Sequence, residues 1–176
     1  MTSKKRVVLI TGAESGIGKS TSKIFLDNGY KVICTYLKNN NNKNTKDIEY
    51  HRIDITKNKD WENLALYIKK KFKKIDVLVN SAGVRLSGNL ETTSMSDWSY
   101  HLNNNVTGTF LACKYILPFL KKAKNSSIIN VASINSIRGA KNMLAYATSK
   151  SAVISFTASL ALDLTKNKIR VNAVAP

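Results

Sequence analysis

RVVLITGAESGIG, residues 6–18, is the stretch of sequence that decides the fold. An apolar run leads into a turn with three glycines, and a helical pattern of apolar residues then continues to Asn28–Gly29. The apolar run is typical of a strand buried on both faces, and Asn-Gly is a signal for a helix end. Residues 6–29 are therefore predicted to form a strand, a tight turn and a helix.

The turn itself, Gly12-x-x-x-Gly16-x-Gly18, suits a phosphate group. Glycines let the backbone turn tightly and approach a ligand closely, and the free N–H groups of a helix N-terminus attract anions. The spacing differs from the commoner G-x-G-x-x-G, and it is wrong for a Walker loop although Lys19–Ser20 follows. A plain strand–helix turn remains the alternative for this motif taken alone.

Apolar strands and helices alternate along the rest of the chain. Strands are expected at 31–36, 49–55, 75–80, 127–133 and 168–175, and helices at about 61–72, 95–122 (with Pro118 as a kink) and 145–164. This alternation predicts right-handed βαβ units and an α/β fold, a doubly wound Rossmann-like parallel sheet between two layers of helices. Thr11, Asn80 and Ser133 fall at carboxyl ends of predicted strands, where such sheets bind ligands.

Ser133, Tyr146 and Lys150 are the strongest catalytic candidates. Ser133 ends a strand-like run, Tyr146 follows 13 residues later, and Lys150 shares a helix face with Tyr146 four residues further on. A phenol beside an ammonium, with a hydroxyl nearby, can pass a proton to or from a carbonyl oxygen. A second Tyr-x-x-x-Lys pair, Tyr67 and Lys71, lacks an upstream serine and is interpreted as part of a solvated surface helix.

Charge, apolar runs and cysteine content bear on whether the chain binds nucleic acid, spans a membrane or holds a metal. The net charge of +17 prompts a nucleic-acid hypothesis, but 23 of the 28 basic residues are lysines, scattered rather than interleaved with aromatic residues, so nucleic acid is not expected as a partner. No apolar run approaches the ~20 residues of a membrane helix. Cys34 and Cys113 form no paired motif, which suits packed thiols in a reducing cytoplasm, and His51 and His101 offer no zinc site.

In their order along the chain, these motifs resemble the short-chain dehydrogenase/reductase family in its typical compact form, and within it the 3-oxoacyl-carrier-protein reductases. The matching segments are TGAESGIG at 11–18, Asp54–Ile55, NSAG at 80–83, Asn105 in NNVTGTF, Ser133, Tyr146-x-x-x-Lys150 and IRVNAVAP at 169–176. Ser81 and Ala132 depart from the usual residues. Because the family continues into a substrate loop and a last strand, the resemblance implies one dinucleotide-binding catalytic domain over 1–176, incomplete at its C-terminus.

The resemblance implies an NAD(P)-dependent oxidoreductase acting on small carbonyl compounds or secondary alcohols. Tyr146 would be the general acid/base, Lys150 would favour the phenolate and bind the nicotinamide ribose, Ser133 would hydrogen-bond the substrate oxygen, and Asn105 would hold a water. The residues expected at the cofactor are Gly12, Ser15, Gly16, Ile17, Gly18, Tyr36, Asp54, Ile55, Asn80, Ala82, Gly83, Tyr146 and Lys150. A cytoplasmic homodimer or tetramer, paired through the two long helices, is also implied. The alternative is an inactive fragment that retains at most nucleotide binding.

The end of the second predicted strand bears on the choice of cofactor. A carboxylate there would bind the adenosine ribose hydroxyls and repel a 2′-phosphate, but the positions hold Tyr36, Leu37 and Lys38. Lys38 could meet the phosphate, whereas Glu14 in the glycine turn argues the other way. The sequence slightly favours NADP(H) over NAD(H).

Overall fold

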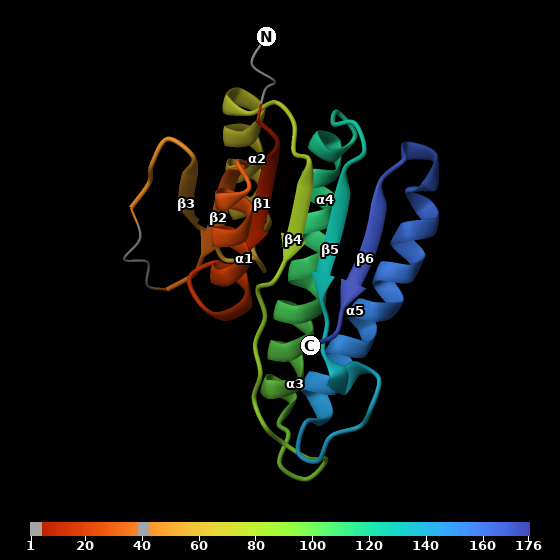
Figure 1. Cartoon of the computed structure of the whole chain (residues 1–176). Coiled ribbons are helices and arrows are strands. Elements are labelled where there is room, and N and C mark those ends of the chain that lie inside the picture. The colour runs from red at the N-terminus through yellow and green to blue at the C-terminus, as the bar shows by residue number, and fades with distance from the viewer. Residues whose placement is uncertain (1–4, 39–42) are drawn as a thin grey trace.

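Six parallel strands form one sheet in the order β3-β2-β1-β4-β5-β6 (Figure 1). The structure, a computed structural model, describes residues 5–38 and 43–176. The strands are β1 (Val7–Thr11), β2 (Lys31–Tyr36), β3 (Ile48–Arg52), β4 (Val77–Asn80), β5 (Ser127–Val131) and β6 (Arg170–Val174). The chain builds outward from β1 in one direction and from β4 in the other, so the predicted doubly wound parallel sheet is confirmed.

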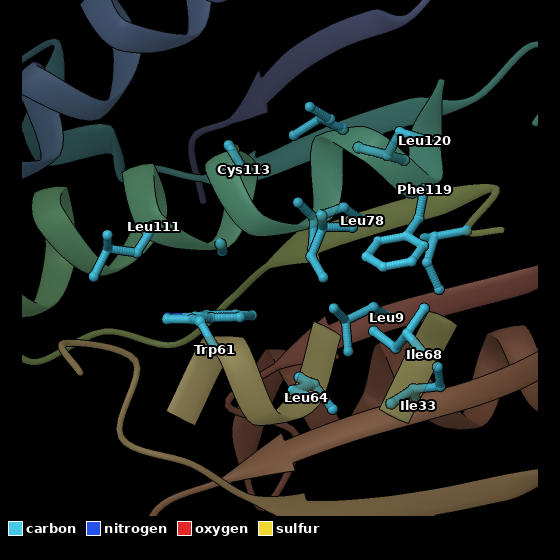
Figure 2. Packing of buried hydrophobic residues seen from close by; sticks show 14 of the residues in the cluster. Leu9, Ile33, Trp61, Leu64, Ile68, Leu78, Leu111, Cys113, Phe119 and Leu120 are labelled. Carbon is cyan, nitrogen blue, oxygen red and sulfur yellow. The ribbon is translucent and has the colours of Figure 1, made fainter. Parts of the chain in front are cut away.

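The two faces of the sheet pack against different helices. Alternate residues of β1 show the division, since Leu9 belongs to the larger apolar cluster and Val8 to the smaller one. The larger cluster includes side chains of α2 (Asn58–Lys71), α4 (Gly108–Leu120) and α5 (Leu144–Asp163), and the smaller one packs against α1 (Gly16–Asp27). Figure 2 shows the larger cluster, in which Trp61 of α2 lies between Leu9 and Leu111. This packing follows from the period-two alternation of a strand.

The long helix predicted over 95–122 is interrupted. It consists of α3 (Met95–His101), a π-helical segment η1 (Leu102–Thr107) and α4, whose last turn contains Pro118. The predicted helix is therefore present as three consecutive segments, and its centre is π-helical where Asn105 lies fully buried. A π turn holds one residue more than an α turn and is frequent at functional sites. The apolar pattern indicates helix on both sides but does not reveal the irregular turn.

Four strands are shorter than predicted, those expected at 49–55, 75–80, 127–133 and 168–175, and the first and third of these bear on the site. β3 ends at Arg52, so Asp54 and Ile55 lie in the following turn, and β5 ends at Val131, so Ser133 caps the short 3-10 helix η2 (Ile134–Ser136). The apolar pattern overran the strands because residues beyond each strand, Ile53 and Ala132, are still buried. After β3 the backbone leaves the sheet, and Ile53 and Ile55 line the cleft described below.

Three further features concern the part of the chain that the structure describes. Burial raises the pKa of both free thiols, Cys34 and Cys113, to about 12. Among the described residues, no group of three or more His, Cys, Asp or Glu side chains could hold a metal ion. No helix in residues 5–38 and 43–176 is both long enough and apolar enough to cross a membrane.

Candidate active site

A cleft of about 770 Å³ lies beyond the carboxyl ends of β1, β2 and β4, where the strand order reverses. Open α/β sheets bind their ligands at this topological position. Eight of the residues predicted at the cofactor line the cleft: Gly12, Ser15, Gly16, Ile17, Tyr36, Ile55, Ala82 and Gly83. Five others are not among its lining residues, namely Gly18, Asp54, Asn80, Tyr146 and Lys150, and their contacts are described below.

The glycine turn is held against the segment that follows β4. Thr11 Oγ1 accepts hydrogen bonds from the backbone N–H groups of Ser81, at 3.1 Å, and Ala82, at 3.0 Å. Gly12 has a φ of +66°, and a Cβ atom on it would lie 2.7 Å from Ala82 Cα. Gly18 lies behind Gly12, because a Cβ on Gly18 would lie 2.2 Å from the Gly12 carbonyl oxygen. The turn after β1 and the segment after β4 therefore meet through the Thr11 hydroxyl and through the close backbone approach that Gly12 permits.

This backbone fits the phosphates of a dinucleotide. Helix α1 begins at Gly16, so the N–H groups of its first turn have no partner within the helix. Gly16 has a φ of +51°, and nothing lies within 4 Å of the position that a Cβ would take. A compact turn with unpaired N–H groups at a helix N-terminus is a site for an anion. The turn can accordingly hold a nucleotide's phosphates at the mouth of the cleft.

Asp54 and Asn80 have structural contacts instead of cleft-facing positions. Asp54 Oδ1 accepts hydrogen bonds from Thr56 N at 2.9 Å and Thr56 Oγ1 at 2.7 Å, which closes the turn after β3. Asn80 is 3% exposed, and its Nδ2 donates to Asn130 Oδ1 at 2.8 Å. Asn130 Nδ2 in turn donates to Thr157 Oγ1 at 2.9 Å. The Asn80 side chain thus links β4, β5 and α5 below the cleft.

Lys150 carries its ammonium to the end of β5. The residue is 6% exposed, and its Nζ donates a hydrogen bond to the Val131 carbonyl at 2.7 Å. A Cβ on Gly83 would lie 3.3 Å from Lys150 Nζ, so the ammonium also lies beside the cleft. Burial lowers the pKa of Lys150 to about 8, which leaves the charged form in excess at pH 7. The site therefore contains a buried cation one helical turn from Tyr146.

Ser133 is fixed relative to the helix that carries Tyr146 and Lys150. Its Oγ accepts a hydrogen bond from Asn135 N at 3.3 Å, and its N–H donates to Ser136 Oγ at 3.0 Å. The carbonyl of Ser136 accepts a hydrogen bond from Ser151 Oγ of α5 at 2.9 Å. These bonds leave the Ser133 hydroxyl hydrogen free to donate to another group.

Asn105 joins the π-helical segment to the cleft wall and to α5. Its Oδ1 accepts a hydrogen bond from Val84 N at 2.8 Å, and its Nδ2 donates to Val84 O at 3.0 Å and to Ser149 Oγ at 2.8 Å. Both hydrogens of the amide are therefore used by protein groups. The predicted role of Asn105, holding a water next to Lys150, stays a prediction.

His101 packs beside Tyr146, although the sequence analysis weighed this histidine only as a possible zinc ligand. It is 1% exposed, its Nε2 accepts from Leu86 N at 2.9 Å, and its Nδ1 donates to Asp97 O at 2.7 Å. A backbone N–H can only donate and a carbonyl can only accept, so the neutral ring carries its hydrogen on Nδ1. The ring centroid lies 6.4 Å from that of Tyr146. No local spacing marks such a contact, because Leu86 and Tyr146 lie far from His101 in sequence.

The second Tyr-x-x-x-Lys pair is not simply solvated, which corrects the prediction. Tyr67 donates a hydrogen bond to Glu49 Oε2, and Lys71 Nζ lies 2.6 Å from Glu49 Oε1 and 2.9 Å from the Tyr67 hydroxyl. Burial raises the pKa of Glu49, but the hydrogen bonds from Lys71 and Tyr67 outweigh it and lower that pKa overall. The pair clamps α2 to the edge strand β3, away from the cleft.

A doubly wound sheet with a glycine turn and a cleft at its switch point defines a dinucleotide-binding protein. The chain belongs to the short-chain dehydrogenase family, since the family model described as "short chain dehydrogenase" matches residues 6–176. The family makes it an NAD(P)-dependent oxidoreductase that acts on small molecules.

Individual relatives agree with this assignment. The chain is 35% identical to the 3-oxoacyl-(acyl-carrier-protein) reductase FabG of Thermotoga maritima, over 97% of this chain and 73% of the relative. It is also 35% identical to dehydrogenase/reductase SDR family member 6 of Aquarana catesbeiana, over 97% of this chain and 70% of the relative. The chain thus spans about 70% of the length of these relatives.

Solved structures give the same fold with either cofactor. Aldohexose dehydrogenase of Thermoplasma acidophilum, free of ligand, matches 98% of this chain and 66% of its own with a TM-score of 0.91 and 35% identity. ElxO with NADP bound matches 98% of this chain and 73% of its own, at 0.89 and 33%. A short chain dehydrogenase of Leptospira borgpetersenii with bound NAD+ matches 98% and 71%, at 0.92 and 28%.

Proposed function

We propose that this chain transfers a hydride between a nicotinamide cofactor and a small carbonyl compound or secondary alcohol, with Tyr146 as general acid/base. The observation that carries the proposal is the buried Lys150 ammonium, which lies beside Gly83 and one turn along α5 from Tyr146. A cation in that position stabilises a phenolate, and so favours loss of the phenol proton. The resemblance to 3-oxoacyl-carrier-protein reductases suggests 3-oxoacyl thioesters as the first substrates to assay.

The residues divide the work of carbonyl reduction as follows. A reduced nicotinamide held in the cleft would supply the hydride that the carbonyl carbon accepts. Tyr146 donates its phenolic proton to the carbonyl oxygen, and Lys150 stabilises the phenolate that remains. Ser133 donates a hydrogen bond to the same oxygen, since its Oγ hydrogen is not used by the bond from Asn135. Alcohol oxidation reverses these steps, with the Tyr146 phenolate as the base.

The test is an assay of the purified chain with NADPH or NADH and a panel of ketones, aldehydes and 3-oxoacyl thioesters. Substrate-dependent loss of the reduced-nicotinamide absorbance is expected with at least one carbonyl compound. Nucleotide binding without turnover on any of them would support the inactive-fragment alternative instead. That alternative is not favoured, because the chain belongs to a family of oxidoreductases and the Lys150 ammonium lies beside Gly83 of the cleft.

We also propose a slight preference for NADP(H) over NAD(H). The end of β2 offers Tyr36 and Leu37 to the cleft and no carboxylate of its own. Lys38 follows at once, and Arg52 of β3 donates through its Nε to the Leu37 carbonyl at 3.1 Å. Two cations at this strand end favour a 2′-phosphate. Nucleotide titrations that gave tighter binding of NADH would contradict this preference.

The proton on Lys150 makes activity and stability respond to pH in opposite directions. The folded-state pKa of about 8 lies below the ordinary 10.5, so the unfolded chain binds more protons between these values. Folding stability contributed by this group therefore rises with pH through that window, whereas carbonyl reduction falls above pH 8 as the cation is lost. A pH–rate profile and thermal melts check this. In a Lys150→Met variant the pH-dependent gain in stability should be smaller, and an equal gain would contradict the assignment.

We further propose that the chain forms a homodimer through α4 and α5. An apolar groove of about 210 Å³ runs between these helices, and Phe110, whose ring lies 6.4 Å from that of Phe156, is 46% exposed at its edge. Light scattering should therefore show a dimer that the Phe110→Glu variant converts to a monomer. Leu66→Glu, on the exposed face of α2, is the matched control because Leu66 is 64% exposed. A monomeric unmodified chain would contradict the proposal.

A further inference from the structure

The turns that lead into the strands of the sheet carry a concentration of cations. Because the strands are parallel, these turns gather at one end of the sheet, opposite the end to which the strand arrows point in Figure 1. Lys121, Lys122 and Lys124 are exposed between α4 and β5, and Lys166 and Lys168 are exposed between α5 and β6. Since β5 and β6 are paired strands, the two turns lie side by side.

Further cations at the same end come from β1 and α2. Arg6 directly precedes β1, Lys73 lies between α2 and β4, and Lys69 and Lys70 belong to the last turn of α2; all four are exposed. Strand β4 pairs with both β1 and β5, so these residues continue the row of lysines. Neighbouring strands lie about 4.8 Å apart, so the row from β1 to β6 spans roughly 14 Å. Together with the lysines of the two turns, these four residues form the amino-end face.

Few carboxylates neutralise the amino-end face. None of its cations forms an ion pair within residues 5–38 and 43–176. Asp47, before β3, is already paired with two other lysines at 2.9 and 3.0 Å, and Asp76, before β4, is 2% exposed. Asp27 and Asp163 are exposed at the ends of α1 and α5. The face therefore presents a net positive charge to solvent, which attracts an extended anionic surface.

The other side chains at this end favour lipid over nucleic acid. Leu162, in the last turn of α5, is 79% exposed, and Ile24, in the last turn of α1, is 62% exposed. By contrast, Tyr30 is half-buried with the Arg6 guanidinium 5.2 Å from its ring centroid, and Phe119 is buried. Base stacking needs open aromatic faces, whereas cations beside exposed aliphatic side chains suit the interface of a lipid bilayer.

We propose that the amino-end face binds the surface of an anionic lipid bilayer. The lysine ammonium groups lie among the headgroup phosphates, and Leu162 and Ile24 enter the interface between them. The cleft lies at the opposite ends of the strands, so it stays open to the aqueous side of the bound protein. This binding does not depend on the reaction proposed for the cleft, and the two can be tested separately.

The experiment measures co-sedimentation of the purified chain with lipid vesicles. Vesicles of phosphatidylcholine and phosphatidylglycerol in equal amounts should sediment the chain, whereas vesicles of phosphatidylcholine alone should not. Raising the ionic strength to about 1 M, where charges are screened within about 3 Å, should release it. The triple variant Lys121→Gln, Lys122→Gln and Lys124→Gln should bind about 100-fold more weakly, since each lysine near an anionic surface contributes about fivefold.

The matched control is the triple variant Lys57→Gln, Lys59→Gln and Lys141→Gln. These exposed lysines lie at or just before the starts of α2 and α5, at the cleft end of the sheet, and their replacement lowers the net charge by the same amount. Vesicle binding by the control should stay within about threefold of the unmodified chain, because charges further away than the screening length contribute little.

Each other result overturns the proposal. Lack of binding by the unmodified chain, equal binding to both kinds of vesicle, or equal losses in the two triple variants would each contradict a lipid site on this face. Tighter binding of a short DNA duplex than of the anionic vesicles would assign the face to nucleic acid instead. If melting shows that the first triple variant does not fold, Lys69→Gln, Lys70→Gln and Lys166→Gln replaces it, with the same expected loss.

Discussion

Replacing Tyr146 with phenylalanine should lower carbonyl reduction by about 10²–10⁴-fold, the usual contribution of a general acid. The change removes one oxygen from a half-buried ring and leaves the ring packed edge-on against His101, 6.4 Å away between centroids. Folding stability and nucleotide affinity should therefore change little. Turnover is measured with a saturating cofactor, and binding is measured separately by calorimetry.

The chain supplies its own matched control for this variant. Tyr67 is also followed by a lysine at the fourth position, and its hydroxyl bonds to Glu49 and Lys71. Tyr67→Phe should keep full turnover and lose stability, because the clamp between α2 and β3 loses a bond of about 0.5–1.5 kcal/mol or more. Equal turnover by the two variants, or loss of turnover from Tyr67→Phe alone, would contradict the assignment of Tyr146.

Gly18→Ala should abolish most nucleotide binding and destabilise the fold. The new Cβ would lie 2.2 Å from the Gly12 carbonyl oxygen and 2.8 Å from its carbon, so the backbone of the glycine turn would have to move. Overpacking of this kind costs about 1–3 kcal/mol or more. A displacement of the turn by about 1 Å can weaken a positioned contact by about 100-fold. Calorimetric titration with NADP+ and a thermal melt measure the two effects.

Gly139→Ala is the control for that variant. Nothing lies within 4 Å of the Cβ that would be added at Gly139, and its φ is not in the left-handed region. Binding should therefore stay unchanged, and stability should change by less than about 1 kcal/mol. If Gly18→Ala bound nucleotide as tightly as Gly139→Ala does, the turn would not be the phosphate site.

The sequence predicts the sheet well because each strand is marked by its own apolar run. The run Val7–Ile10 and the glycines after it are local signals, and so is the i, i+4 pair Tyr146 and Lys150. The carboxyl ends of β1, β4 and β5 converge once the strands are taken as parallel. What local signals cannot supply is the direction in which a polar side chain points from its strand end.

Asn80 and Glu14 illustrate that limit. Both are polar residues at predicted cleft positions, yet Asn80 turns toward Asn130 beneath the sheet edge and Glu14 turns toward Leu37 in the neighbouring segment. The partners lie 50 and 23 residues away in sequence. The partner that such a side chain binds depends on which hydrogen-bonding groups of the neighbouring segments have no other partner in the folded protein. The same holds for His101, whose partner Leu86 belongs to the loop after β4.

The π-helical segment η1 has a consequence for how helix faces align along the chain. One additional residue in a turn shifts every later side chain by about 100° around the axis. Side chains on α3 and α4 are therefore out of phase, as though a residue had been inserted between them. The additional residue lets Asn105 face Val84 and Ser149 while the apolar side chains of α4 face the sheet. In an uninterrupted α-helix, Asn105 and the apolar side chains of α4 would have to share one face of the helix.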